Sequence, residues 1–177
     1  MNSRVYSYVG DADLNDPQLF GTERVMVTAG GAFPASLRRA GIEAGATPSA
    51  FTFIVDTDGL LWIADWPSKH VVCARGGDVL SAGKITINVE DGRVVVSGVT
   101  NMSTGYCPEP ASWPSVEAAL DRAHLTHPSC FTQEYIFRLC ENCGQRNVVK
   151  EEDYTCAVCS GKLPQEWNFR GCAGKTA

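Results

Sequence analysis

Four cysteines near the C-terminus constrain the fold more than any other feature of this sequence. They form two Cys-x2-Cys pairs, Cys140 with Cys143 and Cys156 with Cys159, and twelve residues separate the pairs. Two intervening residues allow both sulfurs of a pair to reach the same ion, and four thiolates can surround one tetrahedral Zn²⁺. The spacing therefore predicts one structural zinc ion per chain, bound by these four cysteines.

The residues around the cysteines have the pattern of short strands and tight turns. Tyr135–Leu139 alternates apolar and polar residues like a strand entering the first pair, and Gln145–Val149 resembles the strand that leaves it. Gly144 and Gly161 follow the two pairs and suit a backbone that turns tightly beneath a metal. Glu151–Asp153 supplies a further turn before the second pair.

With these motifs, residues 135–169 resemble a zinc ribbon with a rubredoxin-like pair of knuckles, whereas residues 1–134 resemble no family that we recognise. The resemblance implies a structural metal with no open coordination position. We expect Trp167 and Phe169 to cover the apolar side of the site. Rubredoxins hold iron on the same frame, so iron is the alternative metal. Two disulfides are the alternative to any metal, but cysteines two residues apart rarely form good structural bridges.

Length and charge indicate a larger globular protein that carries this metal segment. The chain has 177 residues, 44% of them hydrophobic, which suits one core domain and a small appendage. We expect an α+β domain over 1–130, the ribbon over 131–170 and a flexible tail over 171–177. The net charge is −5, and all of it lies in residues 1–130, because residues 131–177 carry six basic and six acidic side chains. Neither a membrane span nor a secretory signal is recognisable, so we expect a cytoplasmic protein with no membrane partner.

The middle of the chain alternates like an antiparallel sheet. Turn residues between alternating runs indicate two hairpins, 51–55 with 60–64 and 84–89 with 93–97. Shorter runs predict three further strands, at 5–9, 24–28 and 71–74. The two hairpins, with or without the run at 71–74, give four or five strands between 51 and 100, so we expect a mainly antiparallel sheet of about five strands.

Two short helices complete the expected α+β fold and are predicted to cover one face of the sheet. The first is predicted over 33–42, with Pro34 in its first turn, and the second over 110–125, with Ser112 as its N-cap. Apolar residues of the second helix recur at helical spacing and predict its buried stripe: Val116, Ala119, Leu120 and Ala123.

Two loops, 66–78 and 101–110, carry the polar residues that are candidates for a functional site. Cys107 as a nucleophile, His70 as its base and Glu109 form a candidate catalytic set, because a thiolate needs a base or cation beside it. Ligand-binding candidates from the same loops are Lys69, Arg75, Ser103, Thr104 and Tyr106. The alternative interpretation is a buried structural thiol and a packed histidine.

His124, His127 and Cys130 have metal-like spacing just before the ribbon. A second zinc there would need a fourth ligand, such as Cys107, Cys172 or an acid. The alternative is a histidine with favourable charge near a helix C-terminus. The sequence lacks the His-x-Glu and Pro-Cys-x-x-Cys motifs of zinc deaminases, and it lacks the Gly-x-Ser-x-Gly and His-Glu-x-x-His motifs.

Three functions are compatible with these features. The favoured one is a zinc-stabilised binding or adaptor protein whose surface for a protein or small-molecule ligand is formed by loops 66–78 and 101–110. The first alternative is a small enzyme that uses the Cys/His site. The second is nucleic-acid binding through the ribbon, with Arg138, Arg146 and Lys150 on phosphate, which the neutral charge of the ribbon does not favour.

Overall fold

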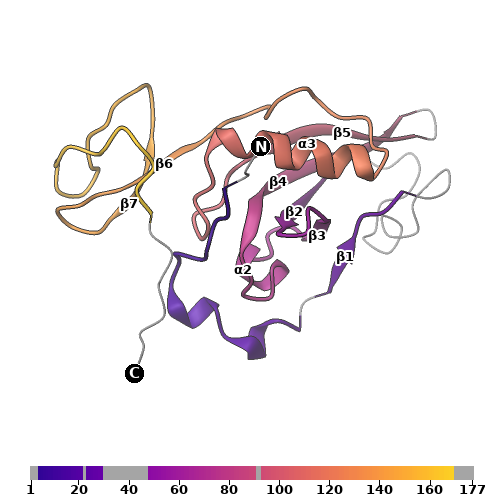
Figure 1. Cartoon of the computed structure of the whole chain (residues 1–177), viewed down its shortest axis with the longest axis horizontal. Helices are drawn as coiled ribbons and strands as arrows, with labels where there is room; N and C mark the ends of the chain where they lie inside the picture. Colours follow the sequence, from indigo (N-terminus) through magenta and orange to yellow (C-terminus); the bar gives the residue numbers. More distant parts are fainter. Residues whose placement is uncertain (1–3, 22, 30–47, 91–92, 170–177) are drawn as a thin grey trace.

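The computed structural model describes residues 4–21, 23–29, 48–90 and 93–169. Within them the fold is α+β, as predicted, with a five-stranded antiparallel sheet, a two-stranded sheet and a few short helices (Figure 1). The helix expected at 33–42 and the tail expected at 171–177, which includes Cys172, lie outside the described residues.

The larger sheet has the strand order β1-β3-β2-β4-β5, and every neighbouring pair is antiparallel. Its strands are β1 (Arg24–Met26), β2 (Ser49–Asp56), β3 (Leu61–Asp65), β4 (Val79–Glu90) and β5 (Arg93–Thr100). Both predicted hairpins and the strand predicted at 24–28 are confirmed. The β2–β3 turn is fixed by Asp56, whose carboxylate accepts hydrogen bonds from the backbone N–H groups of Asp58 and Leu60.

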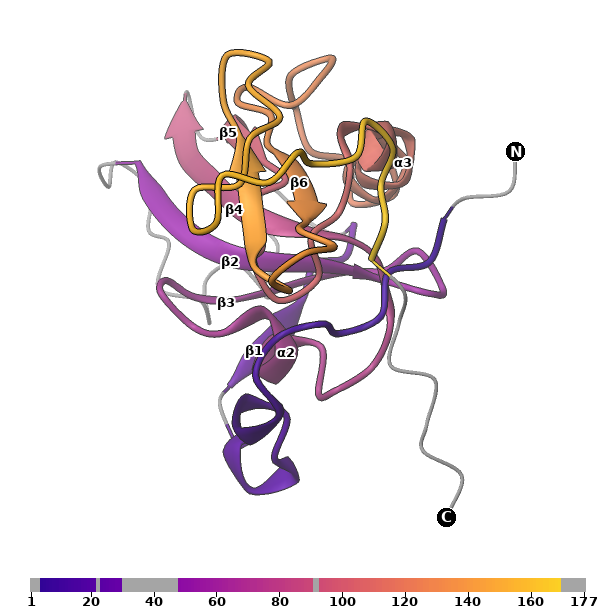
Figure 2. The same cartoon turned by 90° about the vertical axis from the view of Figure 1, so that its left-hand side faces the viewer.

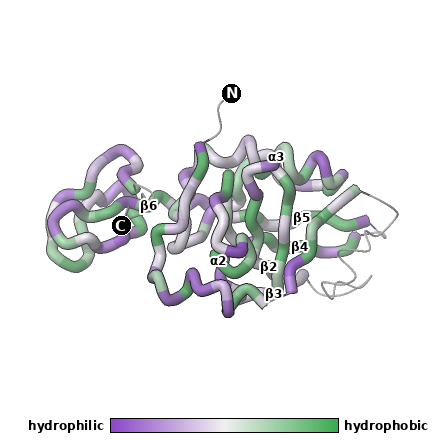
Figure 3. The backbone as a smooth tube through the Cα atoms, turned by 60° about the horizontal axis from the view of Figure 1, so that its bottom comes forward, coloured by the Kyte–Doolittle hydropathy of each residue, from purple (hydrophilic) through white to green (hydrophobic). Residues whose placement is uncertain are grey.

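One face of the sheet is covered by α3 (Trp113–Arg122), which follows the short turn η3 (Pro110–Ser112). The predicted apolar stripe is confirmed, because all four residues are buried: Val116, Ala119, Leu120 and Ala123. Figure 3 shows hydrophobic residues gathered along the central strands. Ser112 lies at the N-cap position of α3, as predicted, but its side chain makes no capping hydrogen bond. Its backbone is already helical, and its hydroxyl lies 2.9 Å from the buried hydroxyl of Ser81 on β4.

The opposite face is covered in part by α2 (His70–Cys73). The strand predicted at 71–74 is therefore wrong. Val72 and Cys73 donate backbone hydrogen bonds to the carbonyl of Lys69, and their side chains are buried against the sheet. The prediction failed because a short apolar run has the same composition in a strand and in a buried helical turn.

Residues 4–9 form an extended segment, here called the N-terminal strap, and not the strand predicted at 5–9. Only Tyr6 pairs with the sheet, through backbone hydrogen bonds in both directions with Val79. The N–H of Val9 donates to the carbonyl of Gly105 at 2.7 Å. The strap passes between the two sheets (Figure 1) and continues into two 3-10 turns, η1 (Ala12–Leu14) and η2 (Pro17–Leu19).

The C-terminal segment forms a lobe beside the larger sheet (Figure 1), and Figure 2 shows the molecule with this lobe in front. Its two-stranded sheet pairs β6 (Ile136–Leu139) with β7 (Arg146–Val149), so both strands predicted around the first cysteine pair are confirmed. The predicted turn at Glu151–Asp153 is also present, and it is flanked by a bridge between Lys150 and Asp153.

Buried polar contacts fix the lobe to the rest of the protein. The side-chain amide of Asn101 donates to the carbonyls of Pro108 and Tyr135, and its oxygen accepts from the N–H of Tyr135 at 2.7 Å. Arg138 on β6 is only 5% exposed, and its guanidinium lies 3.7 Å from the carboxylate of Glu109. These contacts leave the lobe little freedom to rotate.

Trp167 and Phe169 do not cover the cysteines as predicted. They fill the seam between the lobe and the larger sheet, in a cluster with Cys107 and Phe137. The indole N–H of Trp167 donates to the carbonyl of Cys107 at 2.8 Å, and its ring meets Tyr6 edge-on at 5.6 Å. The large aromatic rings therefore pack into the apolar cluster of the seam and not over the cysteines.

Every helix among the described residues is too short or too polar to cross a lipid bilayer.

The packing of α3 gives a direct stability test. Leu120 is 0% exposed, so Leu120→Ala should lower the free energy of unfolding by about 2–5 kcal/mol, measured by urea denaturation. Leu19→Ala is the control, because the same atoms are removed from a side chain that is 45% exposed. It should change the stability by less than about 1 kcal/mol. Equal losses in the two variants would contradict the placement of α3 over the core.

Candidate metal centre and neighbouring cavity

The two cysteine pairs are built by the same backbone pattern. In the first, the N–H of Gly144 donates to the carbonyl of Cys140 at 2.8 Å. In the second, the N–H of Ser160 donates to the carbonyl of Cys156 at 2.9 Å. The N–H of each leading cysteine then donates across its own loop at 2.8 Å. Each pair is therefore a closed turn that holds its two sulfurs on one side.

The residue after each pair has left-handed backbone. Gly144 has φ +74°, a conformation that glycine adopts easily. In the second loop the corresponding residue is Ser160, with φ +58°, and not Gly161. Gly161 lies close to the cysteines. A Cβ there would lie 3.2 Å from the sulfur of Cys159 and 2.4 Å from the side-chain nitrogen of Asn142, which is exposed. A side chain at Gly161 would therefore crowd the sulfur of Cys159.

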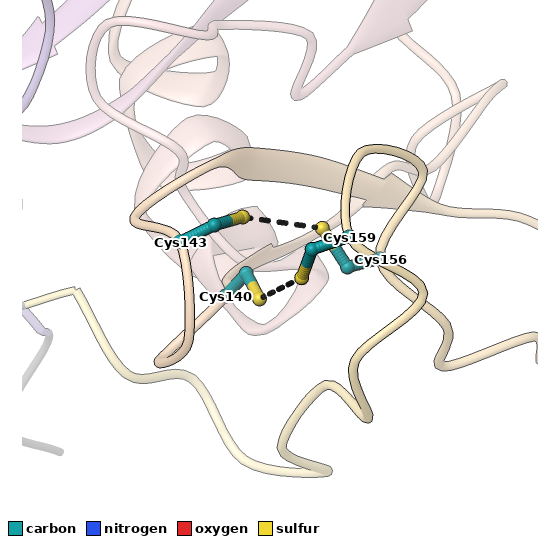
Figure 4. Close-up of side chains that lie close together, drawn as sticks. All are labelled: Cys140, Cys143, Cys156 and Cys159. Atoms are coloured by element: carbon teal, nitrogen blue, oxygen red, sulfur yellow. Dashed lines mark hydrogen bonds between the residues drawn. The ribbon is translucent and has the colours of Figure 1, made fainter.

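The four sulfurs converge on one point between the two loops (Figure 4). All lie within 4.8 Å of one another, with Cys140 and Cys159 at 3.5 Å and Cys143 and Cys156 at 3.7 Å. A tetrahedral ion bound by four thiolates at about 2.3 Å needs sulfurs about 3.8 Å apart. A disulfide would need about 2 Å. The arrangement fits one structural metal ion, and the disulfide alternative is excluded by these distances.

Asn147 on β7 joins the two loops and was missed by the sequence analysis. Its side chain donates to the carbonyl of Gln145 at 2.8 Å and accepts from the N–H of Ala157 at 3.0 Å, and its nitrogen lies 3.6 Å from the sulfur of Cys156. It is 6% exposed. The available signal was a polar residue at an inward position of a short strand. Such a residue orients ligands and tunes the metal from outside the coordination sphere.

Local dipoles favour the ligating form of one cysteine. Backbone N–H groups of Cys159 and Val158 lower the pKa of the Cys156 thiol to about 6. Metals bind the thiolate, so this environment reduces the proton competition at one of the four ligands. The apolar side of the cysteines is covered by Ile136, Val149, Tyr154 and Leu163.

The residues proposed for a second metal site do not come together. Among the described residues, the four cysteines are the only group that converges like metal ligands. His127 bonds instead with the carboxylate of Asp121 at 3.1 Å and the carbonyl of Pro128 at 2.7 Å. Burial lowers the pKa of His127, but these two partners outweigh burial and raise it above its usual value. Cys130 is exposed, and so is His124, which has φ +53°.

The three catalytic candidates each have another partner. The ring of His70 donates from Nε2 to the carbonyl of Gly83 at 3.0 Å, and burial lowers its pKa to about 4. The thiol of Cys107 lies 3.4 Å from the carbonyl of Thr104, and burial raises its pKa to about 12. Glu109 pairs with Arg4 and lies near Arg138. The site therefore lacks the Cys–His hydrogen bond that thiol activation requires.

The five ligand-binding candidates divide into buried and accessible residues. Tyr106 is buried, and its hydroxyl donates to the carbonyl of Gly77 at 2.6 Å. Ser103 is also buried, and its hydroxyl has no hydrogen-bond partner among the described residues. Lys69, Arg75 and Thr104 are exposed. Of the five, Lys69 and Thr104 face a common hollow.

This hollow, here called the cavity, has a volume of about 190 Å³. It is lined by Tyr8, Gly10, Asp11, Leu14, Lys69, His70, Val71, Thr104, Gly105 and Arg146. Both predicted loops thus contribute to one concave site, together with the chain from Tyr8 to Leu14 and with β7 of the lobe. Arg146 reaches it by donating to the carbonyl of Val9 at 2.5 Å and pairing with Asp11 at 3.4 Å.

The three basic residues considered for phosphate contacts are not arranged as a nucleic-acid surface. Arg138 is buried, and its guanidinium donates to the carbonyls of Phe137 and Gln165. Arg146 is engaged at the cavity, and Lys150 alone is freely exposed. Binding to a phosphate backbone needs several accessible cations on one face.

Comparison with protein-family models, with curated proteins and with solved structures gave no match to this chain.

Metal analysis and substitution test the centre. The purified protein should contain about one metal ion per chain, and Cys140→Ser or Cys159→Ser should lose the ion and the dispersed amide resonances of β6 and β7, because metal binding and folding of such a site are one event. Cys130→Ser is the matched control, since this cysteine is exposed and outside the group. Retention of the ion in both ligand variants would contradict the four-thiolate arrangement.

Thiol labelling separates the metal-stabilised protein from the Cys/His enzyme. Iodoacetamide at neutral pH should modify Cys130 quickly and Cys107 at least about a hundredfold more slowly, because the raised pKa of Cys107 leaves almost no thiolate. His70→Asn should leave the Cys107 rate unchanged. Peptide mass spectrometry measures both rates. Fast modification of Cys107 that slows in His70→Asn would instead support catalysis.

Proposed function

We propose that this protein is a zinc-stabilised ligand-binding protein in which a zinc ribbon completes a binding cavity on an α+β domain. The observation that carries the proposal is the origin of the cavity wall, which draws on loop 66–78, loop 101–110 and, through Arg146, the metal-binding lobe. Small-molecule sites are typically concave, lie where several elements meet and carry a few convergent polar groups.

Zinc is the ion that best fits the donor set. Four thiolates in a closed tetrahedral arrangement are typical of structural zinc sites, and the two closed turns match the ribbon that the sequence resembles. A reducing compartment such as the cytoplasm fits this function, because the ligating thiols must stay reduced.

The cavity chemistry favours a small anionic ligand. Lys69 contributes an ammonium group that makes no ion pair among the described residues, and Arg146 contributes a guanidinium only partly neutralised by Asp11. The hydroxyl of Thr104 can add a hydrogen bond. Because His70 donates from Nε2, its neutral ring has an acceptor at Nδ1. A carboxylate or phosphate compound that also carries a hydrogen-bond donor would use all four groups.

The metal and the cavity are mechanically linked. Arg146 begins β7, two residues after Gly144 of the first metal loop. Its contacts with Val9 and Asp11 depend on the folded lobe. Loss of the ion would unfold the lobe and withdraw one of the two cations from the cavity.

A thermal-shift screen with inorganic phosphate, glutamate and AMP tests the proposal. At least one of these anions should stabilise the wild type, and Lys69→Ala should weaken its binding by about tenfold or more, the usual effect of losing a charge-assisted hydrogen bond. Comparing the three compounds separates carboxylate from phosphate recognition. Removal of zinc by a chelator and desalting should abolish the stabilisation.

Lys150→Ala is the matched control, because Lys150 is exposed on the lobe and does not line the cavity. Equal weakening in Lys69→Ala and Lys150→Ala would mean a diffuse charge effect and would overturn the proposal. Failure of all three anions to stabilise the wild type would overturn it as well.

A further inference from the structure

A second hollow, here called the groove, lies on the α2 side of the sheet, where β4 and β5 are left uncovered. Its volume is about 500 Å³. Along β4, Ala82 is buried under α2, whereas Lys84 and Thr86 point to the same side further along the strand and line the groove. Gly98 lies opposite Thr86 on β5 and supplies a floor with no side chain. The groove is separate from the cavity, because the two share no lining residue.

Two aromatic side chains line the groove. Trp66 is 44% exposed, which is unusual for so large an apolar ring, and the ammonium of Lys84 lies 5.3 Å from its centroid. Tyr135 is stacked on Phe137 at 6.3 Å, and its backbone is fixed by Asn101. Aromatic rings at the edge of an open hollow can stack on a ligand with little loss of side-chain conformational entropy.

Between these rings the groove offers uncharged hydrogen-bonding groups. The side chains of Thr86 and Gln133 make no hydrogen bond among the described residues. The oxygen of Thr100 accepts from the N–H groups of Lys84 and Met102, which leaves its hydroxyl hydrogen available. Among the residues that the structure describes, no carboxylate lines the groove, and Lys84 is its one cation.

We propose that the groove binds carbohydrate. A pyranose ring presents a face of C–H groups that packs on the electron-rich face of an aromatic ring, and its edge of hydroxyls suits threonine and amide partners. Single-stranded nucleic acid also stacks on aromatic rings, but its phosphates need several cations. Among the described residues the groove has one cation, Lys84, and the protein carries a net charge of −5. A neutral sugar brings no phosphate charge that the groove would have to neutralise.

Titration of the full-length zinc protein with maltose, cellobiose, lactose and N,N′-diacetylchitobiose tests the proposal. The indole N–H resonance of Trp66, assigned with Trp66→Phe, should shift with at least one disaccharide. Trp66→Ala should weaken that binding by about tenfold or more. Gly98→Val should abolish sugar binding, because its side chain would fill the floor of the groove. The variant should still fold, because an added Cβ would come no closer than 3.4 Å to Thr86 and a β-branched residue is well tolerated in a strand.

Gly21→Val is the matched control, because a Cβ at Gly21 meets nothing within 4 Å and the residue does not line the groove. It should bind like the wild type. No shift of the Trp66 resonance with any of the four sugars would overturn the proposal. Sugar binding that survives Gly98→Val would overturn it too, and so would binding of a dT oligonucleotide that weakens with salt and competes at the same resonance.

Discussion

Convergence of four sulfurs within 4.8 Å is the constraint on which the C-terminal lobe depends. The lobe has two strands of four residues each and a small apolar cluster around the cysteines. A segment of this size buries too little surface to fold alone, so metals or disulfides usually stabilise such units. Binding of Zn²⁺ to four thiolates supplies about 10–16 kcal/mol in small zinc peptides, which is enough to order the backbone of both loops.

The ordered lobe then acts on the rest of the protein through the seam. Arg138 and Asn101 are buried there with their hydrogen bonds satisfied, and Trp167 inserts its ring beside Tyr6. A shift of the lobe would leave the buried guanidinium of Arg138 without its partners, which is strongly destabilising. The seam therefore has a single well-defined geometry. This geometry places loops 66–78 and 101–110 between two hollows. Lys69 and Thr104 face the cavity, whereas Trp66 and Met102 line the groove.

The features that the sequence predicted well depend on patterns among neighbouring residues. Alternation and turn residues identified both hairpins, and helical spacing identified the stripe of α3. Cysteine spacing identified the four cysteines that converge like metal ligands. Contacts between distant segments were not predictable in the same way. Nothing near Trp167 in sequence indicates that it packs on Tyr6, and nothing near Arg146 indicates that it reaches Val9. The apolar run at 71–74 forms a helical turn because tertiary packing overrides local preference.

The N-terminal strap has a consequence for how this chain matures on the ribosome. Besides Val79, its partners include Gly105, Arg146 and Trp167, which are synthesised more than ninety residues after it. The strap therefore cannot complete its contacts until the C-terminal lobe has been synthesised. Such long sequence separation slows folding and lengthens exposure to aggregation.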